Sequence, residues 1–148
     1  MKYIQLFEIY TNASDRKPLF VDEHGKNIIY DNGDGIMIAV DDIEDAHYIT
    51  LWDMNKTGSK KVGFLGITSS KMFFKGKTYN NLDSVEIDRQ YRGRGYGYML
   101  YKTALKFLNN NSDGIVSYLP DRVNKKEVPS IYKKFKNEII DDYHIINR

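Results

Sequence analysis

Hydrophobic and polar positions alternate over short distances in the first half of the chain. Apolar runs at residues 1–10, 28–30 and 36–40 are separated by polar segments that contain Gly, Asn and Asp. Short runs bounded by such residues are typical of β-strands joined by tight turns. We therefore expect a series of short strands here, with a single helical turn at the acidic segment 41–46.

The middle of the chain predicts a β-hairpin. Residues 47–54 and 61–68 are rich in apolar side chains, and they flank the polar segment 55–60, which contains Gly58. Two such runs on either side of a short turn favour a pair of antiparallel strands. The residues that follow, 71–81, fit either a loop or a further short strand.

The second half predicts a strand, a helix and a second strand in succession. Leu82, Val85 and Ile87 mark a short apolar strand, and residues 114–119 mark the next one. Between them, apolar positions recur at steps of three and four, which places them on one face of a helix. These positions are Tyr96, Met99, Leu100, Thr103, Ala104, Phe107 and Leu108. A helix that connects two consecutive strands is a crossover unit, so we expect a partly parallel sheet.

The C-terminal region predicts one more helix and a closing pair of strands. Residues 128–135 fit a helix with Pro129 in its first turn, where proline is tolerated. Residues 138–147 fit two short strands around Asp141 and Asp142. No repeat or Pro/Ser-rich linker interrupts the chain, so we expect one domain over residues 1–148.

The composition narrows the class of protein. With 41% hydrophobic and 28% charged residues, the chain has the balance of a globular protein. No apolar stretch approaches the roughly 18 residues that a membrane helix needs, and Glu8 lies where a signal peptide would be apolar. We expect a cytoplasmic protein with no membrane partner.

Cysteine and histidine usage argues against a metal site. Cysteine is absent, which excludes disulfides, thiolate ligands and a cysteine nucleophile. His24, His47 and His144 lie far apart without the spacing of metal ligands. We expect these histidines to be surface or edge residues and the protein to bind no metal.

Charge is distributed unevenly along the chain. Residues 1–88 hold ten Lys/Arg and fourteen Asp/Glu, whereas residues 89–148 hold twelve and six. A basic C-terminal part favours an anionic ligand there, although ordinary solvated lysines account for much of the excess.

Three glycines at two-residue spacing separate the strand at 82–87 from the helix that follows it. Gly93, Gly95 and Gly97 leave the first amides of that helix uncovered, and such amides lack intrahelical partners. Together with the positive end of the helix dipole they form a site for phosphate. Arg92 and Arg94 add charge-assisted contacts, so the segment predicts a diphosphate ligand.

Two other interpretations of this segment stay open. Arg-Gly clusters with interleaved Tyr can bind nucleic acid. Such clusters usually lie in repetitive disordered tails, whereas this one is single and lies between a strand and a helix, so a nucleic-acid partner is disfavoured. A plain flexible turn is the other interpretation.

The spacing of the motif argues against two familiar classes of diphosphate site. A Rossmann fingerprint would place the third glycine one position later, and a P-loop would require Gly-Lys-Ser/Thr. The segment resembles instead the coenzyme A motif Q/R-x-x-G-x-G/A of the GNAT superfamily of N-acetyltransferases. Gln90, Tyr91, Arg92, Gly93, Arg94 and Gly95 match it in order, and Gly97 fills the small-residue position beyond it.

This resemblance implies a fold and a co-substrate. The fold is of the α/β (α+β) class: one GNAT-like domain with a central mixed, mostly antiparallel sheet of six to seven strands, flanking helices and a parallel pair around the CoA site. Acetyl-CoA is the implied co-substrate. Ile87 would meet the pantetheine arm with its backbone, and residues 92–97 would wrap the pyrophosphate. The implied binding residues are Ile87, Asp88, Arg92, Gly93, Arg94, Gly95, Tyr96 and Gly97.

The resemblance also implies a reaction, the transfer of acetyl to a primary amine of a small molecule or protein by direct attack. By family likeness Tyr132 would protonate the departing thiolate, and Asn124 would be a further catalytic residue. Strand alternation places Glu86 opposite the face of Val85 and Ile87, so it is our candidate base.

The first half departs from the family pattern, because strand-like sequence occupies the place of two expected helices. A catalytically inactive regulatory module with the same fold is therefore an alternative. If the acidic first half lines the acceptor pocket, a cationic amine is the expected acceptor. A homodimer is one expected assembly.

Overall fold

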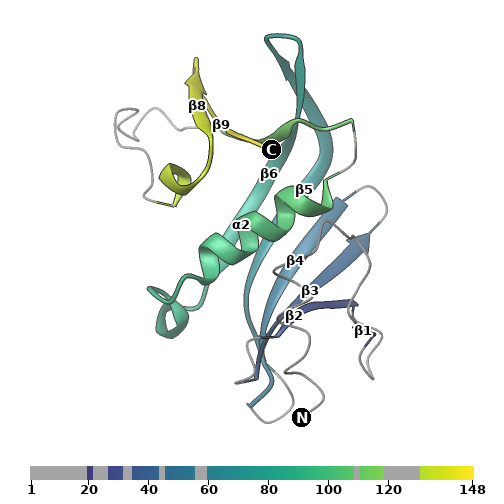
Figure 1. The fold of residues 1–148 in the computed structure, drawn as a ribbon, viewed down its shortest axis with the longest axis vertical. Helices are drawn as coiled ribbons and strands as arrows, with labels where there is room; N and C mark the ends of the chain where they lie inside the picture. Colours follow the sequence, from purple (N-terminus) through teal and green to yellow (C-terminus); the bar gives the residue numbers. More distant parts are fainter. Residues whose placement is uncertain are drawn as a thin grey trace.

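A single curved sheet organises the protein (Figure 1). The computed structural model describes residues 20–21, 27–31, 35–43, 46–55, 60–108, 111–118 and 131–148. Within them, nine strands lie in the order β1-β2-β3-β4-β5-β6-β7-β9-β8. The strands are β1 (Phe20–Val21), β2 (Asn27–Asp31), β3 (Ile36–Ile43), β4 (Ala46–Asp53), β5 (Lys60–Phe74), β6 (Lys77–Ile87), β7 (Gly114–Tyr118), β8 (Asn137–Ile140) and β9 (Tyr143–Asn147).

Helical structure in the described residues comprises one α-helix and two short 3-10 turns. Helix α2 (Tyr96–Phe107) connects β6 to β7, and it crosses one face of the sheet in Figure 1. The 3-10 turns are η1 (Arg89–Tyr91) and η2 (Tyr132–Lys134). None of the described helices is long and apolar enough to cross a membrane.

The expected fold class is confirmed. All strand pairs are antiparallel except β6 and β7, which run parallel through the crossover helix. The short edge strands β1 and β8 bring the number of strands in the described sheet to nine. The predicted hairpin of β4 and β5, the strand before the glycines, the helix after them and the closing pair β8–β9 are all present.

Three local predictions need correction or completion. The helical turn expected at residues 41–46 is wrong, because β3 extends to Ile43 and pairs with Ala46 of β4, so sheet pairing overrides the local preference. Residues 71–81 are strand on both sides of a two-residue turn, where Lys75 and Gly76 have φ of 50° and 79°. The helix expected at 128–135 is, in its described part, only η2. The strand expected at residues 1–10 lies outside the described residues.

Strand β6 pairs with its two neighbours over different lengths. Its antiparallel pairing with β5 continues to Ile87, opposite Gly63. Its parallel pairing with β7 covers only Tyr79 to Asn81. From Leu82 onward, therefore, one edge of β6 has no strand beside it within the described residues.

The main core lies between α2 and one face of the sheet. Side chains from β3, β4, β5, β7 and β9 form one cluster with the inner face of α2, and among them Ile38, Ile49, Leu51, Leu65 and Leu100 are completely buried. Burial of each such side chain contributes about 1.5–3 kcal/mol. The helix is thus held against the sheet by its apolar stripe, and its N-terminus is fixed at the open edge of β6.

Gly114 allows β7 to approach β9 closely. A Cβ on Gly114, whose φ is 154°, would lie 2.0 Å from the carbonyl oxygen of Ile146. We expect Gly114→Ala to lower the free energy of unfolding by more than about 2 kcal/mol, because both the strain and the clash involve backbone. Gly76→Ala is the matched control: its φ is 79° and no atom lies within 4 Å, so about 1 kcal/mol is expected. Urea unfolding measures the free energy of unfolding of both variants. An equal loss of stability in the two would contradict the steric explanation.

Candidate active site

The segment between β6 and α2, together with the first residues of α2, forms what we call the glycine corner, residues 88–98. It begins where the amide of Asp88 donates to the carbonyl of Val62 at 2.8 Å, and η1 follows. Gly95 caps α2 in the left-handed conformation, with φ of 85°, and accepts the first helical hydrogen bond from Met99 at 3.2 Å. The amides of the helical residues before Met99 therefore lie at the open, positive end of the helix dipole. No acidic residue lies in this first turn.

The three glycines of the corner have two different physical roles. Gly93 and Gly95 have φ of 76° and 85°, and a Cβ on either would meet no atom within 4 Å. Their backbone conformation requires glycine, and the space in front of them is open to a ligand. At Gly97 a Cβ would lie 2.9 Å from Cδ1 of Ile131 and 3.5 Å from Cδ1 of Ile87. This glycine allows α2 to pack closely against the segment that leads to Tyr132.

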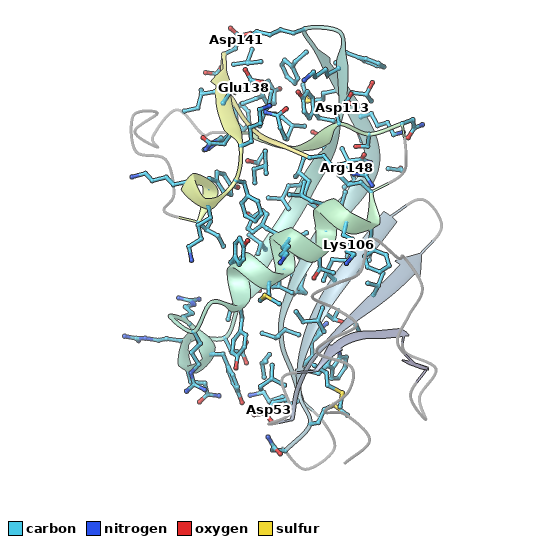
Figure 2. The ribbon with its side chains drawn as sticks, viewed as in Figure 1. Asp53, Lys106, Asp113, Glu138, Asp141 and Arg148 are labelled. Atoms are coloured by element: carbon cyan, nitrogen blue, oxygen red, sulfur yellow. The ribbon has the colours of Figure 1, made fainter. Side chains whose placement is uncertain are left out.

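A buried hydrogen bond anchors the corner to the sheet. Tyr91 is buried, and its hydroxyl donates to the carboxylate of Asp53 at the end of β4. This hydrogen bond, together with burial, raises the pKa of Tyr91. In Figure 2, Asp53 lies at the lower end of the sheet, whereas Glu138 and Asp141 lie at the opposite end of the molecule. The corner is thus fixed in place, and these C-terminal acidic side chains are remote from it.

The two arginines of the corner make different contacts. The Nε of Arg92 donates to the carbonyl of Ile87 at 2.8 Å, on an exposed side chain. The guanidinium of Arg94 lies 5.7 Å from the centre of the Tyr91 ring, a cation–π distance. Neither of these two contacts involves an acidic side chain, so both guanidinium groups keep their positive charge near the corner.

Two adjoining hollows lie along the open edge of β6. The larger has a volume of about 780 Å³, within the size range of ligand sites, and the smaller about 270 Å³. Both are lined by Ile87, Arg92, Gly97 and Ile131, which therefore lie between them. The smaller hollow lies over the glycines, and the larger extends along β6 to Tyr132.

The structure brings most of the sequence-predicted residues together around these hollows. Glu86, Ile87, Asp88, Arg92, Gly97 and Tyr132 line the larger one, and Ile87, Arg92, Gly93, Gly95, Tyr96 and Gly97 line the smaller. Arg94 lines neither and lies over Tyr91 instead. Asn124 lies outside the described residues. Glu86 is exposed, on the strand edge that no neighbouring strand covers in the described sheet.

Tyr132 belongs to a cluster of three hydroxyls. Its side chain is buried, with its oxygen 3.1 Å from the hydroxyl of Tyr101 and 3.3 Å from that of Ser117. Sequence reasoning missed both partners. Tyr101 lies four residues after Gly97, on the same helix face, and that spacing was the signal available for it. Burial, and then the neighbouring Tyr132, raise the pKa of Tyr101 strongly, so Tyr101 stays protonated.

Residues of the C-terminal hairpin β8–β9 contact Tyr132 and hold it in position. The side-chain nitrogen of Asn137 donates to the carbonyls of Tyr132 and Phe135, each at 3.0 Å. Its oxygen then accepts from Nε2 of His144 at 3.2 Å. The ring of His144 meets the ring of Tyr132 edge-on, with 4.3 Å between centroids.

The prediction that the histidines are surface or edge residues is wrong for His144. It is 1% exposed, because β9 lies between β7 and β8 inside the sheet. Its Nδ1 is buried without a hydrogen-bond partner among the described residues. His24 and the side chain of His47 lie outside what the structure describes. In the described part of the chain, no group of three or more His, Cys, Asp or Glu could hold a metal ion.

Comparison with known proteins gives one family and several structures. The family model described as the acetyltransferase (GNAT) family matches residues 7–134. No curated protein matches the chain.

The first of the similar structures is that of Arabidopsis thaliana NAA60 in complex with a bisubstrate analogue. It has a TM-score of 0.53 and 13% identity, and the match covers 70% of this chain and 75% of that one.

Two similar structures are of a tyrosine-to-phenylalanine mutant of the toxin AtaT bound to the C-terminus of the antitoxin AtaR, one of them also with acetyl-CoA. Their TM-scores are 0.52 and 0.50 at 17% and 18% identity, each covering 69% of this chain and 68% of that one. At these identities, the structural likenesses establish the fold alone.

The buried His144 makes stability depend on pH. Burial lowers its pKa below the ordinary 6.5, so the unfolded chain binds the proton more readily. The contribution of neutral His144 to the free energy of unfolding is complete above about pH 6.5 and is lost as the pH falls through the folded-state pKa. This loss amounts to no more than about 1.4 kcal/mol per pH unit. Urea unfolding between about pH 7.5 and pH 5 measures the free energy of unfolding. We expect this free energy to fall more for the wild type than for His144→Gln, in which all other titrating groups remain. Parallel curves would contradict this expectation.

Proposed function

The chain belongs to the GNAT acetyltransferase family, and from that premise we propose that it transfers the acetyl group of acetyl-CoA to a primary amine. One observation carries the proposal: open amides at the positive end of α2 adjoin a hollow of about 780 Å³ that reaches the hydroxyl cluster of Tyr132. A diphosphate site at one end and a proton donor at the other is the arrangement that a thioester carrier requires.

Acetyl-CoA, the co-substrate of the family, fits the corner in charge and in shape. The pyrophosphate would lie on the amides of residues 92–97, in the open space before Gly93 and Gly95. The pantetheine arm would run along the uncovered edge of β6, past the apolar side chains of Val85 and Ile87. The carbonyl of Ile87 accepts from Nε of Arg92 and has a second lone pair for the arm, while the other nitrogens of the guanidinium would face a phosphate.

The chemistry would proceed by direct attack. Glu86, at the wall of the larger hollow, would accept a proton from the ammonium of the acceptor. The free amine would form a C–N bond to the thioester carbon, and the C–S bond would break with its electron pair on sulfur. Tyr132 would give its proton to that thiolate, and the second proton that the nitrogen loses as the amide forms would return to the Tyr132 phenolate. The products are an amide and free CoA.

The acceptor would be a small molecule or a protein amine. The carboxylate of Glu86 at the hollow favours a cationic group there, in agreement with the acidic first half of the chain. A non-catalytic GNAT-fold module is the alternative: it would bind acetyl-CoA but release no thiol with any amine in a panel of small amines and lysine-bearing proteins.

We expect Gly95→Ala to raise the Kd for acetyl-CoA at least about 10-fold in calorimetry. A Cβ there strains the cap, whose φ is 85°, and protrudes into the space assigned to the pyrophosphate. Gly76→Ala is the matched control, since it has nearly the same φ, 79°, in a turn outside the site, and its Kd should equal that of the wild type. Equal affinity of all three proteins would show that the diphosphate binds elsewhere.

We expect Tyr132→Phe to lower kcat about 100-fold or more while the Kd for acetyl-CoA changes less than about 2-fold, because the hydroxyl acts on the leaving thiolate. Thiol release with the best acceptor from the amine panel measures kcat, and calorimetry measures Kd. Tyr118→Phe is the control, since Tyr118 is exposed on β7 and its ring packs on Tyr143. Unchanged turnover in Tyr132→Phe would remove this residue from the mechanism.

A further inference from the structure

The hydroxyl cluster contains more polar groups than one proton donor needs. Tyr101 comes from α2, Ser117 from β7 and Tyr132 from η2, so three separate elements converge on this point. Tyr101 is almost completely buried and Ser117 is half-buried. A buried hydroxyl without a partner is destabilising, so Tyr101 has a physical reason to bond to the Tyr132 oxygen.

The direction of these hydrogen bonds changes when Tyr132 loses its proton. While Tyr132 is neutral, either oxygen of each pair can be the donor. A phenolate has no proton to give, so both neighbours can then only donate to it. Hydrogen bonds to a charged acceptor are about twice as strong as neutral ones. The two contacts therefore gain strength only as the proton leaves Tyr132, which is when a catalytic interaction is useful.

The surroundings of the cluster hold its geometry. The rings of Tyr101 and Tyr132 meet edge-on with 5.4 Å between centroids, and His144 packs on Tyr132 at 4.3 Å. The side-chain nitrogen of Asn137 donates to the carbonyl of Tyr132 and so fixes the backbone of Tyr132. An oxygen held in this way needs little rearrangement to receive both hydrogen bonds.

We propose that Tyr101 and Ser117 are positioning residues that stabilise the phenolate formed when Tyr132 protonates the leaving thiolate of CoA. This role rests on the proposed function of Tyr132 as the acid. Each neighbour would donate a hydrogen bond to the phenolate of Tyr132 and would leave the binding of acetyl-CoA unchanged.

The direct test is the acidity of residue 132 alone. With 3,5-difluorotyrosine incorporated at position 132, a phenol that titrates near neutral pH, fluorine NMR follows its ionisation without alkaline unfolding. We expect the pKa of this difluorotyrosine to be about one pH unit higher in Tyr101→Phe and in Ser117→Ala than in the parent. Each variant loses one hydrogen bond to the phenolate. Tyr118→Phe, which alters the neighbour of Ser117 on the other side of β7, should leave it unchanged. A lower or unchanged pKa in both variants would overturn the proposal.

The kinetic test uses two acetyl donors that differ in their thiol. With acetyl-CoA we expect Tyr101→Phe to lower kcat about 10-fold at constant Kd. With an acetyl thioester of an acidic aryl thiol, which leaves without a proton, the defect should shrink to less than about 2-fold. An equal defect with both donors would overturn the role of Tyr101. If the wild type releases no thiol with any amine, the proposed function fails, while the fluorine titration still decides whether the two hydroxyls stabilise the phenolate.

Discussion

The separation of β6 from β7 is the constraint on which the site depends. The two strands pair in parallel only from Tyr79 to Asn81, while β6 stays paired with β5 as far as Ile87. An uncovered strand edge normally invites pairing with another chain. Here α2 and η2 border the opening, so the backbone of β6 faces a hollow with defined walls. Where β6 has separated from β7, the chain continues into the glycine corner, and the first amides of α2 lie at one end of that hollow.

Much of this arrangement follows from local sequence. The strand that ends at Ile87, the conformational freedom of Gly93 and Gly95 and the apolar stripe of α2 are each set by residues close together in the chain. The glycine spacing therefore predicted the strand-to-helix turn. Gly97 shows where this reasoning becomes incomplete: it has the same spacing as the other two, but its small size serves packing against Ile131.

The features that sequence reasoning missed arise from contacts between distant segments. Tyr101 sits beside the apolar stripe of α2 and resembles any core tyrosine until Ser117 and Tyr132 are brought to it from β7 and η2. His144 is buried because β9 inserts between β7 and β8, a strand order that hydrophobic pattern does not determine. Residues 41–43 of the acidic segment form strand because β4 supplies their hydrogen bonds. In each case the decisive partner lies outside the local window of residues.

In the proposed reaction, the two ends of the site would meet negative charge in physically different ways. The diphosphate of the carrier is charged at all times, so fixed backbone amides, the dipole of α2 and two exposed arginines suit it. The charge on sulfur appears only as the C–S bond breaks, and a permanent cation beside it would also attract other anions. A buried tyrosine with two hydroxyl neighbours is neutral until it gives up its proton, and it then finds hydrogen bonds ready for the phenolate. Under the proposed function, the arginines of the glycine corner would serve the permanent charge, and the hydroxyls of Tyr101 and Ser117 would serve the transient one.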